Sequence, residues 1–219
     1  MLRLLFEKTG NGIYISHLDL MRLFQRAFQR AGLALTHSQG YNQRPSVSIA
    51  LPLSLGTASY CEFLDFDLER ESPPFEEIRD RLNRALVAGI RVREVYGAQR
   101  KPKELAFLLV KIAMEYDREL PKTAEKEIAK MFLSDELCVE KRGKNGPVSQ
   151  DILPLLRFVS VKREGARHLA LRALLSAQNP TLNPAAIVSA VEQTLPELAP
   201  DFVQFTRLEA YDAEIKLFR

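Results

Sequence analysis

The 219 residues are 46% hydrophobic and 27% charged, which is typical of a folded globular protein and excludes a disordered one. No apolar run is as long as a membrane span and the first residues do not form a secretion signal, so we expect a cytoplasmic protein without a membrane partner. The net charge of +3 is uneven, because residues 1–48 hold six Lys/Arg against two Asp/Glu while the rest hold 25 against 26. Only the start of the chain therefore favours an anionic partner.

The first half of the chain predicts the element order β-α-β-β-α-β. Alternating apolar residues predict a strand over residues 2–7. A helix is predicted over Ser16–Gly32, because an S-x-x-D capping pattern opens it and a glycine suits its end. The other elements expected in this half are two strands, a helix opened by Ser72-Pro73 and a closing strand, over residues 47–50, 62–68, 72–86 and 90–95.

The polar segment Gly97–Glu104 interrupts this pattern, and we place a domain boundary there, between residues 1–98 and 105–219. A similar order recurs beyond it, with strands predicted over 107–116, 137–141, 156–161, 168–175 and 202–211 and helices over 123–134 and 183–195. This order predicts an α+β fold of two tandem ferredoxin-like domains, the first of which carries the candidate site.

Three arginines recur at every fourth position of the first predicted helix. Arg22, Arg26 and Arg30 fall on its solvent side about 6 Å apart, so each can meet one phosphate of a nucleic acid. The alternative is an ordinary solvated helix face. Lys8 and Arg44 are the further cations that we assign to phosphate contacts.

A loop dense in polar side chains follows this helix over Thr36–Gly56. Tyr41 can stack on a base while Gln39 and Asn42 bind base edges, as in single-stranded RNA recognition. The alternative is a turn-rich loop whose side chains satisfy their own backbone. Because the loop begins soon after the helix ends, we expect Arg26 and Asn42 on one surface.

Two histidines are candidates for proton transfer. His17 lies in the first turn of the predicted helix, where it can contact RNA, act as a general base or only hydrogen-bond to the capped turn. His37 lies in the polar loop and is a second candidate base. The chain has no Walker loop, G-x-G-x-x-G, H-E-x-x-H or G-x-S-x-G motif, so it indicates no enzyme class and leaves catalysis open.

The two cysteines argue against a metal or cofactor held by this chain. Cys61 and Cys138 are too few for a disulfide framework, and neither stands in a C-x-x-C pair or a Cys/His cluster. We therefore expect no metal site, no cofactor, and both cysteines in the hydrophobic core.

Several short segments together have the pattern of a known family: Phe6–Gly10, Ile15–Asp19, Met21-Arg22, Arg26-Ala27, Arg30–Leu33, Ser38–Asn42 and Ala50–Leu53, with Gly56 and Glu62, and more weakly Asp151 and Pro154. These segments resemble the bacterial radical-SAM-linked protein family. Members of that family are encoded beside, or fused to, a cobalamin-type radical SAM enzyme, often near ribonuclease E/G and ribosomal-protein genes. The resemblance implies RNA or ribosome metabolism and a radical SAM partner.

The resemblance also implies where the cofactors would lie and where this chain departs from the family. The partner would carry the iron–sulfur cluster, since this chain lacks the three-cysteine ligand set. The family tends to have Asn-Pro-His-Pro where this chain has Asn42-Gln43-Arg44-Pro45, so a role that needs this histidine is not available here.

The tandem domain order further resembles the CRISPR repeat-RNA endoribonucleases, an analogy of fold rather than of function. Three hypotheses follow. The first is an RNA-binding or substrate-presenting accessory protein that works with a radical SAM enzyme. The second is a metal-independent endoribonuclease that uses His17 or His37. The third is a protein-interaction adaptor that binds no nucleic acid. The sequence leaves the oligomeric state open.

Overall fold

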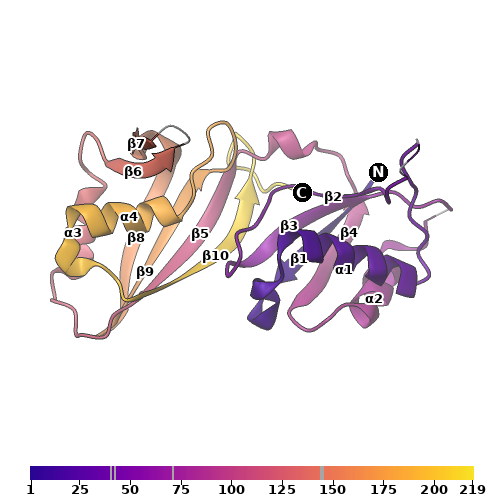
Figure 1. Cartoon of the computed structure of the whole chain (residues 1–219), viewed down its shortest axis with the longest axis horizontal. Coiled ribbons are helices and arrows are strands. Elements are labelled where there is room, and N and C mark those ends of the chain that lie inside the picture. Colours follow the sequence, from indigo (N-terminus) through magenta and orange to yellow (C-terminus); the bar gives the residue numbers. More distant parts are fainter. Residues whose placement is uncertain (40, 42, 71, 144–145) are drawn as a thin grey trace. The chain divides into compact units, whose positions relative to one another are not determined.

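The computed structural model describes residues 1–39, 41, 43–70, 72–143 and 146–219. The chain has an α+β fold and divides into two compact units, Met1–Glu104 together with Arg219, and Leu105–Phe218 (Figure 1). Each unit has its own sheet strands and its own pair of helices.

The first unit has the predicted β-α-β-β-α-β order. Its elements are β1 (Leu2–Lys8), η1 (Gly10–Tyr14), α1 (His17–Arg30), β2 (Val47–Ile49), β3 (Ala58–Phe66), α2 (Phe75–Ala85), β4 (Ile90–Gly97) and η2 (Pro102–Glu104). The strands lie in the spatial order β4-β1-β3-β2, and every neighbouring pair is antiparallel. Both helices therefore connect strands that are not neighbours, because β1 lies between β3 and β4 and β3 lies between β1 and β2.

Helix α1 spans His17–Arg30, with the predicted Ser16 as its N-cap and the predicted Gly32 just after its C-cap Ala31, because local groups satisfy both ends. The Ser16 Oγ accepts the backbone N–H of Asp19 at 3.2 Å and donates to the Asp19 carboxylate at 2.7 Å. This bond to Ser16, assisted by Arg22, lowers the pKa of Asp19. At the other end Gly32 adopts a φ of +68°, which a glycine accepts without steric cost.

The two helices of the first unit pack on one face of its sheet. Leu4 and Phe6 of β1 are fully buried there, together with Leu64 and Phe66 of β3. Phe24 of α1 meets Phe6 edge-on, with ring centroids 4.8 Å apart. The rest of this core comes from both helices and β4, chiefly Leu20, Ala27, Phe28, Ile78, Leu82, Ile90 and Val92.

A buried ion pair lies on the other face of the same sheet. Arg3 alternates with Leu4, and Asp65 with Leu64, so both point away from the helices. Arg3 is completely buried, and its Nε and Nη2 donate to the two carboxylate oxygens of Asp65 at 2.6 and 2.9 Å. Burial by itself lowers the pKa of Arg3, but the bond and charge of Asp65 raise it above its ordinary value.

The second unit repeats this strand order around an inserted hairpin. Its elements are β5 (Phe107–Glu115), α3 (Ala124–Met131), β6 (Cys138–Gly143), β7 (Gly146–Asp151), η3 (Leu153–Leu155), β8 (Leu156–Gly165), β9 (His168–Ser176), α4 (Ala185–Thr194), η4 (Pro196–Leu198) and β10 (Phe202–Tyr211). Strands β10-β5-β9-β8 lie side by side and are antiparallel, while β6 and β7 pair only with each other in the described part of the chain. The shared strand order is what tandem ferredoxin-like domains require, and we keep that interpretation.

The inserted hairpin departs from the sequence prediction in two ways. Strand β7 was not predicted, because a glycine and a proline open it and depress strand propensity. Cys138 opens β6 and is exposed, so its predicted place in the core is wrong, whereas Cys61 on β3 is buried. The Glu136 carboxylate accepts the Cys138 thiol at 3.0 Å and raises the pKa of that thiol.

No group of three or more His, Cys, Asp or Glu side chains among the described residues is placed to hold a metal ion. Within those residues, no helix has both the length and the apolar character that crossing a membrane requires.

Candidate nucleic-acid interface

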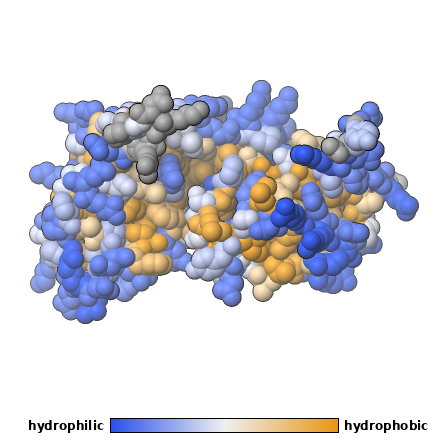
Figure 2. Space-filling model, in the orientation of Figure 1, coloured by the Kyte–Doolittle hydropathy of each residue, from blue (hydrophilic) through white to orange (hydrophobic). Residues whose placement is uncertain are grey.

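The three arginines of α1 lie exposed on the side opposite the core. Phe24, Ala27 and Phe28 are buried, and the helical period turns Arg22, Arg26 and Arg30 to solvent. Figure 2 shows strongly hydrophilic residues over α1, beside hydrophobic ones.

The arginines differ in how far neighbouring groups already engage them. Arg22 Nη1 lies 3.2 Å from Asp19 Oδ1 in an exposed pair. The Arg30 Nη2 donates to the carbonyl of Ala85, at the end of α2, at 2.7 Å. Arg26 has no hydrogen-bond or ion-pair partner in the part of the chain that the structure describes. It is therefore the arginine of the three that is most available to an external anion.

Helix α2 adds two arginines that the sequence analysis missed. Arg30, Arg81 and Arg84 line one open hollow, together with Glu77 and the small residues Ala31 and Ala85. Arg81 pairs with Glu77, and Arg84 Nε donates to the Asp80 carbonyl at 3.3 Å. The charges along α2 do not distinguish these two arginines from the others in the sequence. They become neighbours of Arg30 only because α1 and α2 pack on the same sheet face.

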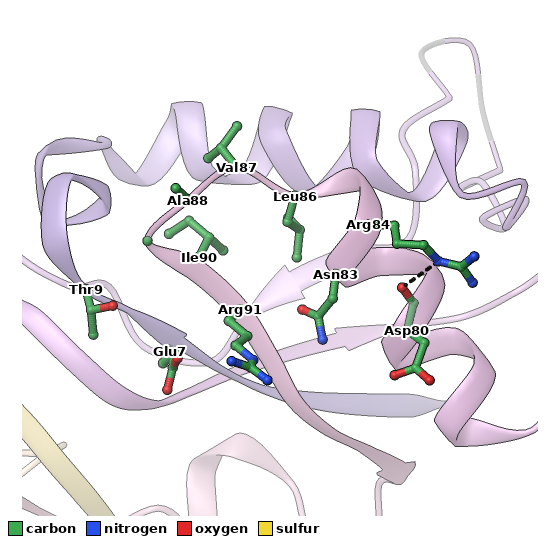
Figure 3. Close-up of a pocket in the computed structure, with 11 residues that line it drawn as sticks. Glu7, Thr9, Asp80, Asn83, Arg84, Leu86, Val87, Ala88, Ile90 and Arg91 are labelled. Atoms are coloured by element: carbon green, nitrogen blue, oxygen red, sulfur yellow. Dashed lines mark hydrogen bonds between the residues drawn. The ribbon is translucent and has the colours of Figure 1, made fainter.

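A second hollow adjoins the first, since Arg84 lines both. It lies between the end of α2, the turn after it, and the paired ends of β1 and β4 (Figure 3). Its charges are mixed, with Arg84 and Arg91 facing it together with Glu7 and Asp80. Glu7 is moreover paired to Arg93 of β4 at 2.8 Å. This hollow is therefore a poorer anion site than the one beside Arg30.

Gly89 holds the turn beside the second hollow. Its carbonyl accepts the backbone N–H of Thr9 at 2.7 Å, and its φ is +89°. A Cβ at this position would lie 2.4 Å from the Thr9 carbonyl oxygen, so only glycine fits. The backbone segments that follow β1 and precede β4 are thus held together by a hydrogen bond and by close backbone packing.

The polar loop forms a hairpin-like arm over residues 36–46. Backbone bonds run from Ser46 N–H to the Thr36 carbonyl at 2.7 Å and from Ser38 N–H to the Arg44 carbonyl at 2.8 Å. The Arg44 N–H in turn donates to Ser38 Oγ at 3.0 Å. The alternative raised by the sequence, that loop side chains satisfy the loop's own backbone, therefore holds for Ser38.

The tip of this 36–46 arm presents polar and aromatic side chains to solvent. The Tyr41 side chain is fully exposed, and Gln39, Gln43 and Arg44 are exposed as well. Asn42 lies outside the described residues, so the expected convergence of Arg26 and Asn42 on one surface stays a prediction. The described tip offers one stacking surface and several hydrogen-bonding groups.

The two histidines lie in different surroundings. The Nδ1 of His17 is buried and has no hydrogen-bond partner in the described part of the chain, and no carboxylate is paired with it there. His37 is exposed, and its Nδ1 lies 3.5 Å from Glu69 Oε1. Only His37 therefore has an acidic neighbour of the kind that orients a general base.

Lys8 does not belong to the surface where the sequence analysis placed it. It is 1% exposed, and its Nζ donates to the carbonyl of Ile13 at 3.0 Å. Burial lowers the pKa of Lys8, and the charge of Glu62 opposes that effect only in part. The assignment of Lys8 to a phosphate contact is thus wrong, because it continues the inward alternation of Leu4 and Phe6 along β1.

Comparisons with known proteins place the chain among uncharacterised relatives. No protein with a curated description matches it. One chain of the crystal structure of a Cbf5-Nop10-Gar1 complex is similar with a TM-score of 0.53 and 9% identity, over 95% of this chain and 48% of that one. The present chain thus spans about half of that neighbour, and the likeness is one of fold alone.

A second solved structure, of an unknown protein from Galdieria sulphuraria, aligns over 97% of this chain and 96% of that one, with 10% identity and a TM-score of 0.25. A TM-score this low carries no argument about fold or function. The sequence comparison is more decisive, because one family model matches residues 1–184. The chain belongs to that family, described as uncharacterized protein conserved in bacteria (DUF2344).

Proposed function

We propose that the first unit binds single-stranded RNA through α1 and the 36–46 arm. The observation that carries this proposal is the exposed row of Arg22, Arg26 and Arg30 on a helix whose opposite side is committed to the core. Arginine suits phosphate because its planar fork donates two parallel hydrogen bonds. Arg81 and Arg84 extend the same cationic surface onto α2.

The tip of the arm supplies the base contacts in this proposal. The Tyr41 side chain is fully exposed, so its ring is accessible for stacking. A base stacked on this ring would bury its apolar face. Gln39, two positions earlier in the chain, is exposed and carries both a donor and an acceptor group. Asn42 and Arg44 complete the set that we assign to RNA.

We further propose that the protein acts as an accessory or substrate-presenting subunit of a radical SAM enzyme. The resemblance described above supports this partnership, and the fold is similar to that of a chain from a multi-protein complex. The partner would hold the iron–sulfur cluster. Co-purification of the tagged protein with a radical SAM enzyme from its own cells tests the partnership separately from RNA binding.

One observation favours a second candidate function, metal-independent RNA cleavage. The approach of His37 to Glu69 gives this histidine an acidic neighbour that can orient its imidazole as a general base. Incubation with a labelled RNA pool decides this point. Cleavage that is lost in His37→Ala but retained in His17→Ala would establish RNA cleavage with His37 as the general base. Loss of cleavage in His17→Ala alone would assign the general base to His17.

The RNA-binding proposal is tested by the salt dependence of affinity. Each phosphate contact on a single strand contributes about −0.7 to the slope of log K against log salt. Changing Arg22, Arg26 and Arg30 together to Gln should therefore flatten the slope by about two units. Tyr41→Ala should weaken binding by about 1–3 kcal/mol at every salt concentration, because stacking does not release counterions.

The matched control exchanges cations that lie outside the proposed surface, Lys101 and Lys103 to Gln, and should leave the salt slope unchanged. An unaltered slope in the triple arginine variant would show that α1 presents only a solvated face. The remaining hypothesis, an adaptor that binds no nucleic acid, would then take first place.

A further inference from the structure

Strand β8 forms one edge of the sheet in the second unit. It pairs with β9 and with no other strand among the described residues. The backbone N–H of Arg163 donates to Glu125 Oε2 of α3 at 3.0 Å, so this amide points away from β9. Antiparallel pairing alternates, and the amides of Val161 and Val159 therefore also point outward, where no described residue accepts them.

An apolar groove runs along this edge. It has a volume of about 310 Å³ and lies between the end of α3 and β8. Leu133 on its rim is 83% exposed, and Phe158 is 50% exposed. We call it the β8 groove; its lining is Ala129, Phe132, Leu133, Leu153, Leu156, Arg157, Phe158, Val159 and Val161. Exposed apolar side chains beside free strand amides form a template for a further strand.

The two faces of this edge differ in chemistry. Val159 and Val161 pair with buried Ala173 and Leu171 of β9, so they lie on the core side of the sheet, as α3 does. Phe158 and Lys162 alternate with them and point to the other face. A strand added here would place every second side chain against apolar groups.

The charge on the opposite face is positive. Lys162 is exposed there. The strand register shifts between Leu156 and Phe158, so Arg157 leaves the simple alternation, and its guanidinium lies over the ring of Phe107 at 5.4 Å, on the same face as Lys162. The acid of this strand, Glu164, is already engaged by Lys111 at 3.0 Å. The intervening side chains of an added strand would therefore meet uncompensated positive charge.

We propose that the β8 groove docks an extended segment of a partner protein that alternates apolar and acidic side chains and adds to the sheet as a further strand. A second copy of β8 fits less well, because it would bring basic residues against basic ones. This inference concerns the second unit and does not depend on RNA binding by the first.

The test uses the full chain and short fluorescent peptides of alternating Val and Glu, with alternating Val and Lys as the comparison. The Val/Glu peptide should bind and the Val/Lys peptide should bind roughly tenfold more weakly or not at all. Leu133→Asp should weaken Val/Glu binding roughly tenfold or more by placing a charge in the groove. The equally charged Leu55→Asp, at an exposed leucine of the first unit, should not.

Two further changes distinguish strand addition from nonspecific hydrophobic binding to the groove. Val161→Pro removes only an outward amide, and an edge strand tolerates that loss. The variant should therefore bind the Val/Glu peptide more weakly without unfolding. Should that variant not fold, peptides methylated on alternate amides replace it, because only one of the two methylation phases can pair with β8. Reversing Arg157 and Lys162 to Glu should exchange the preference in favour of Val/Lys.

The proposal is overturned by equal binding of both peptides, by no binding of either, or by indifference to Leu133→Asp and to amide methylation. It is overturned as well if sedimentation shows a wild-type dimer that Leu133→Asp dissociates, because the groove would then pair two copies of the chain.

Discussion

At the scale of residues, the buried Arg3–Asp65 pair makes the first unit sensitive to the loss of either partner. Its side chains are 0% and 8% exposed. Asp65→Asn leaves a buried guanidinium without its counter-charge and should cost about 3–5 kcal/mol of unfolding free energy. Replacing both residues with apolar ones, as Arg3→Met with Asp65→Leu, should cost much less, because neither charge is then left alone.

Urea denaturation of the single and double variants measures this coupling. Asp80→Asn is the matched control, since it breaks an exposed pair with Arg79 whose Nε–Oδ1 distance is 2.8 Å. That control should leave the unfolding midpoint in place, because solvent screens such pairs. Additive losses in the Arg3/Asp65 cycle would mean that the two charges are not coupled.

Tyr116 makes the stability of the second unit sensitive to alkaline pH. Its hydroxyl donates to the Leu198 carbonyl at 3.0 Å, and burial raises its pKa to about 12. In the unfolded chain a tyrosine titrates near 10, so above pH 10 the unfolded state loses protons that the folded state keeps. Stability is therefore complete below pH 10 and falls as the pH rises towards 12, by at most about 1.4 kcal/mol per pH unit.

The variant Tyr116→Phe should show a smaller loss of stability between pH 9 and 11 than the wild type, in urea unfolding at each pH. At neutral pH the same variant should be less stable by about 1 kcal/mol, because the Leu198 carbonyl loses its donor. Tyr60→Phe, at an exposed ring, should keep the wild-type pH dependence. Equal slopes for all three proteins would refute the role assigned to Tyr116.

At the scale of elements, the turn between α2 and β4 depends on one glycine. Gly89→Ala combines a φ of +89° with a contact of 2.4 Å to the Thr9 carbonyl oxygen, so the backbone must move. Gly32→Ala, at the end of α1, has a φ of +68° and no atom within 4 Å, and should cost only the conformational penalty of about 1 kcal/mol.

The loss of unfolding free energy should consequently be at least about twice as large for Gly89→Ala as for Gly32→Ala. Gly97→Ala controls for the substitution itself, since its added methyl group meets no atom within 4 Å and its φ is ordinary. Equal losses at positions 89 and 32 would show that the β1–η1 segment yields easily to the added Cβ.

At the scale of the whole molecule, the charge is divided unequally between the two units. The first unit, residues 1–104 with Arg219, holds 16 Lys/Arg against 12 Asp/Glu, while residues 105–218 hold 15 against 16. If RNA binds the first unit alone, changing Arg157 and Lys162 to Gln should leave the salt slope of RNA binding unaltered. The triple arginine variant of α1 should flatten that slope by about two units in the same titration. Equal flattening by both variants would place RNA on both units.

The sequence by itself determined those features that depend on neighbours within one or two helical turns. The Ser16 cap, the stop of α1 just before Gly32 and the outward turn of Arg22, Arg26 and Arg30 all follow from the helical period and local hydrogen bonds. The strand and helix order of the first unit was predictable for the same reason, because each element carries its own apolar period.

Only the tertiary structure decided features that depend on residues far apart in the chain. Lys8 is buried because β3 and η1 close over the end of β1, and Arg81 joins Arg30 because both helices pack on one sheet face. The β6–β7 hairpin and the free edge of β8 likewise follow from which strands pair. Pairing and packing join groups dozens of positions apart, and no local period encodes that choice.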